Sequence, residues 1–192
     1  MKKIVISIRP EWAREILNRK KTIEVRKGLA IYNVLKKTEE NGEEVEFHMY
    51  VTKAKPYLDY IEEYDDDGYL VFEGEYELRG YGSFDSEPYC NLNGKIVAMF
   101  KAKAEVIKYH NHRNLDDWCG YFIDRGEKIG IGEIELCESP CLNRRELDDY
   151  LQEKQGTALH IEDPRIFDAP KTLADYGLKR APQSWAYSKE GR

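Results

Sequence analysis

Three charged side chains in the segment KKTIEVRKG could act together on one ligand. In a strand, Glu24 and Arg26 lie on the same face, about 7 Å apart, shortly after Lys21. A carboxylate can accept from a base amino group, a guanidinium can grip a phosphate or a base edge with two hydrogen bonds, and an ammonium adds a point charge. The same spacing also fits an ordinary exposed salt bridge, which contributes little to stability. From the spacing alone, such a salt bridge is favoured over a ligand-binding site.

A second group of candidate binding residues lies near the C-terminus, in the segment KRAPQSWAY. Gln183 and Ser184 offer an amide and a hydroxyl. Trp185 and Tyr187 offer rings on which an unpaired base can stack, for about 1 to 3 kcal/mol per base. The alternative is that Trp185 belongs to the core. Arg9, in the basic N-terminal segment, is a further candidate ligand-binding residue.

Catalytic and metal centres are less well supported by the sequence. If the protein is an enzyme, we expect Lys21 to act as nucleophile or base and Glu24 to shuttle protons. No Ser-His-Asp order and no recognised glycine-rich phosphate loop is present in the sequence, and we expect no cofactor. The side chains that come closest to a metal-ligand pattern are His110, His112, Cys119, Cys137 and Cys141. Their spacing matches no common zinc module, so we expect no metal site.

Length and charge limit the architecture and the partners. The 192 residues fit one domain spanning 1–192. The net charge of −6 argues against a broad duplex-binding surface, yet residues 1–37 carry a net charge of +8 and residues 179–192 carry +3. Two basic ends around an acidic centre can form one anion-attracting patch if the fold brings the termini together.

The chain carries no recognisable targeting signal. The N-terminal stretch MKKIVISIRPEW turns polar too early for a signal peptide, and no apolar run approaches the length of a membrane span. The four cysteines form no CxxC pair, which favours reduced thiols over a secreted disulfide framework. We therefore expect a cytoplasmic protein with no membrane partner, and the oligomeric state stays open.

The elements that must position these residues follow from periodicity. Residues 3–8 form a β-branched run, and Pro10 can start a helix directly after it. In the segment PEWAREILNRKK, Trp12, Ile16 and neighbouring apolar residues share one helical face. The segment TIEVR alternates, so Ile23 and Val25 face opposite to Glu24.

The remaining elements are mostly strands. We expect helical turns at 30–37, a short helix at 115–123, and a helix from 143 to 156 that Asn143 and Glu146 cap and Gly156 ends. The expected strands are 46–53, 69–78, 95–107, 159–167 and 184–189. The fold class is therefore α+β and mainly β, with a curled antiparallel sheet.

The motif residues resemble the signature of a known family. The ASCH domain, a branch of the PUA-like superfamily, has the approximate pattern Gly-x-Lys-x-x-Glu-x-Arg, which falls here on Lys21, Glu24 and Arg26. Arg19 stands at the glycine position, so a non-glycine residue must make the tight turn. The ending ALHIEDPRIFDAP…ADYGLKRAPQSW is similar to that of a phage and bacterial PUA-like subgroup, whose final strand returns beside the first.

The resemblance implies a fold and a function. The implied fold is a PUA-like small β-barrel with flanking short helices. The implied site is a polar cleft, between the Lys21/Glu24/Arg26 strand and the C-terminal strand, that binds RNA or a modified nucleotide. The alternative is a hydrolase of a nucleoside amide such as an acylated cytidine, or a ribonuclease, using Lys21 and a carboxylate. The amidohydrolase-like members have a threonine at the position of Glu24, which weighs against hydrolysis. A scaffold without ligand is a third possibility.

Overall fold

Strands dominate the part of the chain that the structure describes. The computed structural model describes residues 1–64, 70–79, 91–110, 120–125 and 142–189. These residues belong to two compact units. Unit 1 comprises Met1, Lys20–Val45 and Lys101–Asp163, and unit 2 comprises Lys2–Arg19, Glu46–Phe100 and Pro164–Arg192. The expected α+β, mainly β class is confirmed, and the single domain over 1–192 stays a prediction.

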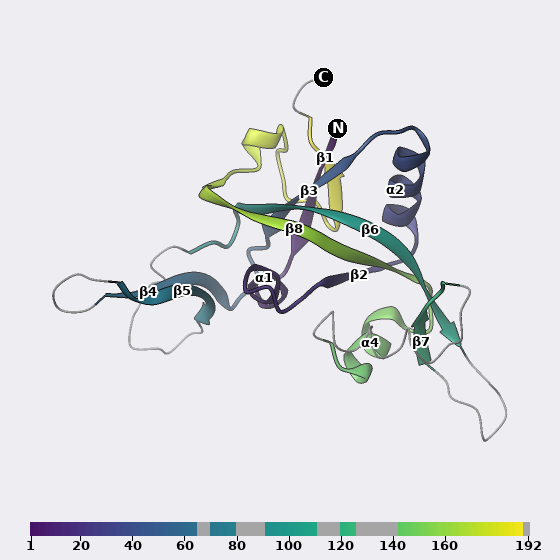
Figure 1. The fold of residues 1–192 in the computed structure, drawn as a ribbon, viewed down its shortest axis with the longest axis horizontal. Coiled ribbons are helices and arrows are strands. Elements are labelled where there is room, and N and C mark those ends of the chain that lie inside the picture. Colours follow the sequence, from purple (N-terminus) through teal and green to yellow (C-terminus); the bar gives the residue numbers. More distant parts are fainter. Residues whose placement is uncertain (65–69, 80–90, 111–119, 126–141, 190–192) are drawn as a thin grey trace. The chain divides into compact units, whose positions relative to one another are not determined.

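Unit 1 is a sheet with helices. Its elements are β2 (Ile23–Lys27), α2 (Ala30–Glu40), β7 (Gly120–Ile123), α4 (Arg144–Leu151) and parts of β6 (Ile96–His110) and β8 (Gly156–Lys171). The strand order is β2-β8-β6-β7 (Figure 1). Strand β2 pairs antiparallel with β8, so that Ile23 lies opposite His160 and Arg26 lies opposite Thr157. The two strands of the ASCH-like motif and of the ALHIEDP segment are therefore neighbours.

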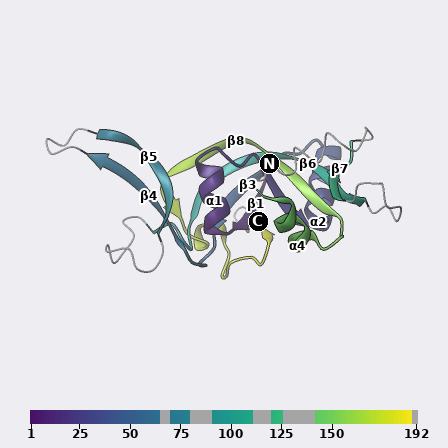
Figure 2. The same cartoon turned by 90° about the horizontal axis from the view of Figure 1, so that it is seen from below.

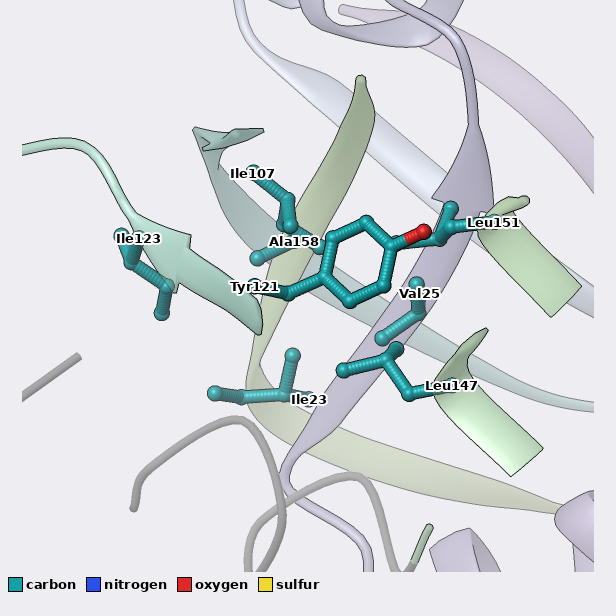
Figure 3. Packing of buried hydrophobic residues seen from close by; sticks show 8 residues of the cluster. All are labelled: Ile23, Val25, Ile107, Tyr121, Ile123, Leu147, Leu151 and Ala158. Atoms are coloured by element: carbon teal, nitrogen blue, oxygen red, sulfur yellow. The ribbon is translucent and has the colours of Figure 1, made fainter. Parts of the chain in front are cut away.

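One face of β2 forms the core of unit 1. Figure 3 shows Ile23 and Val25 packed among Leu147 and Leu151 of α4 and Tyr121 of β7. All five side chains are buried. The alternation predicted from TIEVR is thus confirmed: its apolar face is inside, which leaves the opposite face of β2 for the charged residues.

Helix α4 begins with the predicted capping box. The Asn143 side chain accepts from the Glu146 backbone N–H at 3.0 Å, and a Glu146 carboxylate oxygen accepts from the Asn143 N–H at 2.8 Å. The predicted end at Gly156 is wrong, because the helix already ends at Leu151 and Gln152 adopts the left-handed conformation with φ 54°. Gly156 instead starts β8, where a Cβ would lie 2.9 Å from the Leu151 side chain.

Unit 2 contains the first and the last strand of the described residues, which the resemblance predicted to be neighbours. Its elements are β1 (Lys2–Ile8), α1 (Pro10–Leu17), most of β3 (Val45–Val51), β4 (Tyr57–Tyr64), β5 (Leu70–Arg79), the 3-10 helix η1 (Ala174–Tyr176), β9 (Trp185–Tyr187) and parts of β6 and β8. The strand order is β6-β3-β1-β9. Strand β9 pairs antiparallel with β1, with Ile4 opposite Tyr187 and Ile6 opposite Trp185. The prediction that the final strand returns beside the first is confirmed.

Helix α1 lies against the two-stranded ribbon of β4 and β5 (Figure 2). The predicted apolar face is confirmed, since Ala13 and Ile16 are buried, but the helix ends at Leu17 rather than continuing to Lys21. Asn18 then bonds to the backbone of Tyr76 through both its amide nitrogen, at 2.9 Å, and its carbonyl oxygen, at 3.1 Å. Arg19 makes the turn with φ 58°, the left-handed conformation for which the family pattern has glycine.

Several predicted elements need correction. Strand β4 was not predicted, because its sequence YLDYIEEY does not alternate between apolar and polar residues. Gly120–Ile123 is a strand and not part of a helix, while 115–119 lies outside the described residues, as do the candidate metal ligands His112, Cys119, Cys137 and Cys141. Strand β8 was predicted at 159–167 and is longer at both ends, because it spans Gly156–Lys171. No helix in the described ranges is long and apolar enough to cross a membrane.

Candidate functional site

The three motif side chains in unit 1 form a buried ionic cluster. The Lys21 ammonium lies 3.4 Å from one oxygen of Glu24, and an Arg26 guanidinium nitrogen lies 3.0 Å from the other. Lys21 is 3% exposed, Glu24 6% and Arg26 9%. Strand β2 produces this arrangement, because alternation puts Glu24 and Arg26 together on the face opposite Ile23 and Val25.

Burial excludes the interpretation of this cluster as an ordinary exposed salt bridge. Buried charges are tolerated only when they are paired, and here one carboxylate serves two cations. The same burial limits the access of a ligand to the cluster. Only small parts of these side chains are exposed, and Arg26 is the most exposed of the three. The prediction that these three side chains lie together is confirmed. Their role in binding or catalysis stays a prediction.

Tyr150 is a neighbour of this cluster that the sequence did not indicate. It lies on α4, half-buried, with the Lys27 ammonium 4.8 Å from the centre of its ring. Burial raises the pKa of the Tyr150 phenol, while the Arg26 guanidinium opposes that rise and the Glu24 carboxylate adds to it. A tyrosine between two leucines of an amphipathic helix is indistinguishable from an ordinary core residue in sequence.

Unit 2 contains a hollow formed by the C-terminal segment, which we call the C-terminal hollow. Its volume is about 920 Å³. The described lining residues are Leu178, Lys179, Arg180, Ala181, Pro182, Gln183, Ala186, Tyr187, Ser188 and Lys189. Three of these are cations and none is a carboxylate. All three cations are exposed, and no ion pair joins them to a carboxylate within the described ranges. The hollow is therefore suited to an anion.

Strand β1 holds the segment that lines this hollow. Pairing of β1 with β9 fixes one end. The Ser7 hydroxyl donates to the Pro182 carbonyl oxygen at 2.7 Å, and the Ser7 N–H donates to the Ser184 carbonyl oxygen at 2.9 Å. Pro182 also restricts the preceding backbone. These bonds hold residues 182–187 against β1.

Two of the four predicted C-terminal residues line the hollow. Gln183 and Tyr187 do so, and Tyr187 is 38% exposed. Trp185 is half-buried and supports Tyr187 edge-on, with ring centres 5.7 Å apart at 88°. Trp185 and Ser184 do not line it, and neither does Arg9, whose guanidinium pairs with Glu11 at 2.8 Å. The predicted cleft joining β2 to the C-terminal strand involves both units and stays a prediction.

No local sequence signal marks the basic lining as a site. Lys179 and Arg180 begin the segment KRAPQSWAY, and all three cations contribute to the net charge of residues 179–192, but no pattern in the sequence assigns a binding role to any of them. The turn at η1 and Gly177, whose φ is 65°, puts Leu178 and Lys189 at the same hollow. The distribution of charge along the chain could suggest an anion site but could not place it.

The fold of this chain is similar to that of an ASCH protein of known structure, as the motif predicted. The crystal structure of ASCH from Zymomonas mobilis has a TM-score of 0.52 with this chain at 14% identity, covering 98% of this chain and 89% of that one. A single-residue mutant of that Zymomonas mobilis protein gives a TM-score of 0.51 at 14% identity, with 99% and 92% covered. No family model and no curated protein matches the sequence.

Proposed function

We propose that this protein binds single-stranded RNA or a phosphate-bearing nucleotide in the C-terminal hollow. The observation that carries the proposal is the lining of that hollow, which combines three exposed cations with an amide and an exposed aromatic ring. Its volume of about 920 Å³ lies in the range of known ligand pockets, roughly 300 to 1,000 Å³. The proposed site thus has the groups and the size that one nucleotide needs.

Each lining group has a chemical role in this proposal. Lys179, Arg180 and Lys189 attract the phosphate, and the arginine can bond two of its oxygens at once. The Gln183 amide carries both a donor and an acceptor, which suits the edge of an unpaired base. Tyr187 offers a ring face for stacking, worth about 1 to 3 kcal/mol.

The ionic cluster on β2 is proposed as a second group of ligand-binding residues. Arg26 is its most exposed member, and it is the one that could reach a ligand oxygen. This part of the proposal predicts that removing the guanidinium weakens RNA binding without unfolding the protein. An Arg26→Lys variant tests it, since the charge stays beside Glu24 while the two-pronged donor is removed.

The decisive experiment is a binding titration with labelled single-stranded RNA at several salt concentrations. We expect Lys179→Ala combined with Lys189→Ala to weaken binding at least tenfold and to reduce the salt dependence, by about 0.7 in the slope for each phosphate that the variant no longer neutralises. The matched control is Lys36→Ala combined with Lys37→Ala, two exposed lysines of α2 that do not line the C-terminal hollow. Equal affinities for the two double variants would refute the proposal.

A parallel titration with nucleoside monophosphates distinguishes the two proposed ligands, single-stranded RNA and a free nucleotide. Tight binding of a monophosphate indicates a nucleotide site, whereas binding only of the oligonucleotide indicates an RNA site. Because no feature of the described residues singles out a hydrolytic centre, hydrolysis of acylated cytidine or of RNA stays a prediction. Product analysis with the wild type and a Lys21→Ala variant tests it directly.

A further inference from the structure

Unit 2 contains a buried chain of three polar side chains that the proposed function has not used. The Nε2 atom of His48 lies 2.6 Å from a Glu46 carboxylate oxygen, and its Nδ1 atom lies 2.7 Å from the Tyr176 hydroxyl. Glu46 is 8% exposed, and the other two are 2% exposed. Glu46 and His48 lie on the same face of β3, and His48 contacts Tyr176 of η1 from that face.

The positions of the protons follow from the partners. An ionised Glu46 can only accept, so Nε2 of His48 carries the proton that it donates to the carboxylate. Nδ1 then has a free lone pair, and the Tyr176 hydroxyl donates to it. The neutral imidazole therefore satisfies both hydrogen bonds. A protonated imidazole would have donors on both nitrogens, and the Tyr176 hydroxyl would have to turn and donate elsewhere.

Tyr176 connects this chain to the C-terminal hollow. Its carbonyl oxygen accepts from the Lys189 N–H at 3.0 Å and from the Ser188 hydroxyl at 3.4 Å. The next residue, Gly177, passes so close that an added Cβ would lie 2.9 Å from the Cβ of Lys189. Leu178, Ser188 and Lys189 all line the hollow. Any movement of Tyr176 therefore moves two sides of the proposed site together.

The surroundings of His48 determine its charge. Phe167 of β8 stacks on the imidazole with ring centres 5.9 Å apart, and the Lys171 ammonium lies 4.3 Å from the centre of the Phe167 ring. Burial lowers the pKa of His48 below its ordinary 6.5, with Lys3 of β1 and Lys171 of β8 acting in the same direction and Glu46 against it. The lowered pKa favours the neutral imidazole, which is the form that satisfies both hydrogen bonds.

We infer that His48 is a positioning residue for the C-terminal hollow, which holds Tyr176 and the Lys189 backbone in the binding geometry and releases them when it is protonated. This inference rests on the proposed function for its ligand. The hydrogen bonds on which it depends can be tested without any ligand.

The test combines amide hydrogen exchange with binding of a hexauridine RNA that has no terminal phosphate. This probe lacks the second ionisation that a terminal phosphate undergoes near about pH 6, so its charge does not change in the range studied. Two variants are used. Tyr176→Phe removes the hydroxyl, while His48→Gln keeps one donor and one acceptor and does not titrate.

We expect the Lys189 amide to exchange at least tenfold faster in Tyr176→Phe than in the wild type at pH 7.5, with the far-UV circular dichroism unchanged. We expect the wild type to lose at least fivefold in RNA affinity between pH 7.5 and pH 5, and His48→Gln to lose less than twofold. An unchanged Lys189 exchange rate, or the same pH dependence in His48→Gln, would overturn the inference. If the wild type bound no RNA at any pH, the proposed function would be refuted. Faster Lys189 exchange in Tyr176→Phe would then show that the hydrogen bonds of His48 and Tyr176 do hold the Lys189 backbone, and that only the proposed ligand was wrong.

Discussion

Replacing Glu24 by Gln should destabilise the protein strongly, because it removes the charge that two buried cations share. The side chain of Lys21 is 2% exposed and that of Arg26 is 10% exposed, so neither can be hydrated where it lies. Removing one partner of a buried ion pair typically costs about 3 to 5 kcal/mol in the free energy of unfolding. Small domains are stable by roughly 5 to 15 kcal/mol, so this is a large fraction of the total.

Equilibrium unfolding in urea, followed by circular dichroism, measures this effect. The matched control is Glu44→Gln, which removes a carboxylate from an exposed pair with Lys101, where the side chain of Glu44 is 65% exposed. Such a pair contributes at most about 1 kcal/mol. If Glu24→Gln lowered the free energy of unfolding by less than about 1 kcal/mol, as little as the control does, the reasoning would be refuted. The cluster would then be hydrated, and its contribution to stability would not depend on burial.

Replacing the whole cluster by apolar residues separates the charge effect from packing. In the triple variant Lys21→Met, Glu24→Leu and Arg26→Met, no charge is left unpaired, so we expect it to be markedly more stable than Glu24→Gln. If the triple variant were the less stable of the two, the loss in Glu24→Gln could not be assigned to unpaired cations.

Three further predictions concern stability. Arg19→Gly should raise the free energy of unfolding by about 1 kcal/mol, since Arg19 has φ 58°; a loss measured in the same urea assay would contradict this. Stability should fall as the pH drops through 6.5, the ordinary pKa of His48, because the unfolded chain binds a proton that the buried neutral imidazole does not; thermal melts between pH 7.5 and 5 should show a smaller decline for His48→Gln, and equal declines would refute the assignment. Asn143→Ala should lower stability by about 1 kcal/mol through loss of the cap on α4, with Asp149→Ala on the same helix as the control; no difference between these two variants in urea would show that the cap is unimportant.

The elements that the sequence predicted well are those with a strong local signal. β1 has a β-branched run, α1 has Pro10 at its start and an apolar face, and α4 has its capping box. Each signal lies within a few neighbouring residues, where steric preference and side-chain periodicity act directly. These elements could therefore be placed without knowledge of the rest of the chain.

The elements that were missed depend on distant partners. β4 has no alternating pattern of apolar and polar residues and becomes a strand by pairing with β5. β8 was predicted at 159–167, but it extends from Gly156 to Lys171. It does so across Pro164, which has no backbone donor, and Asp163, which has a positive φ of 49°. Periodicity carries no information about such pairing, because hydrogen bonds between strands join residues far apart in sequence.

Some features of the candidate site could also be predicted from local sequence, whereas others depend on the tertiary structure. Period-two alternation in TIEVR is enough to bring Glu24 and Arg26 to one face of a strand beside Lys21, because the local backbone fixes the direction of each side chain. The burial of these charges follows from the packing of the folded chain and cannot be read from any short segment. The residues that line the C-terminal hollow are close in sequence, but the segment is held in place by pairing of β9 with the distant strand β1. The same holds for the hydrogen bond between His48 and Tyr176, which are 128 positions apart and meet only when the intervening chain has been ordered.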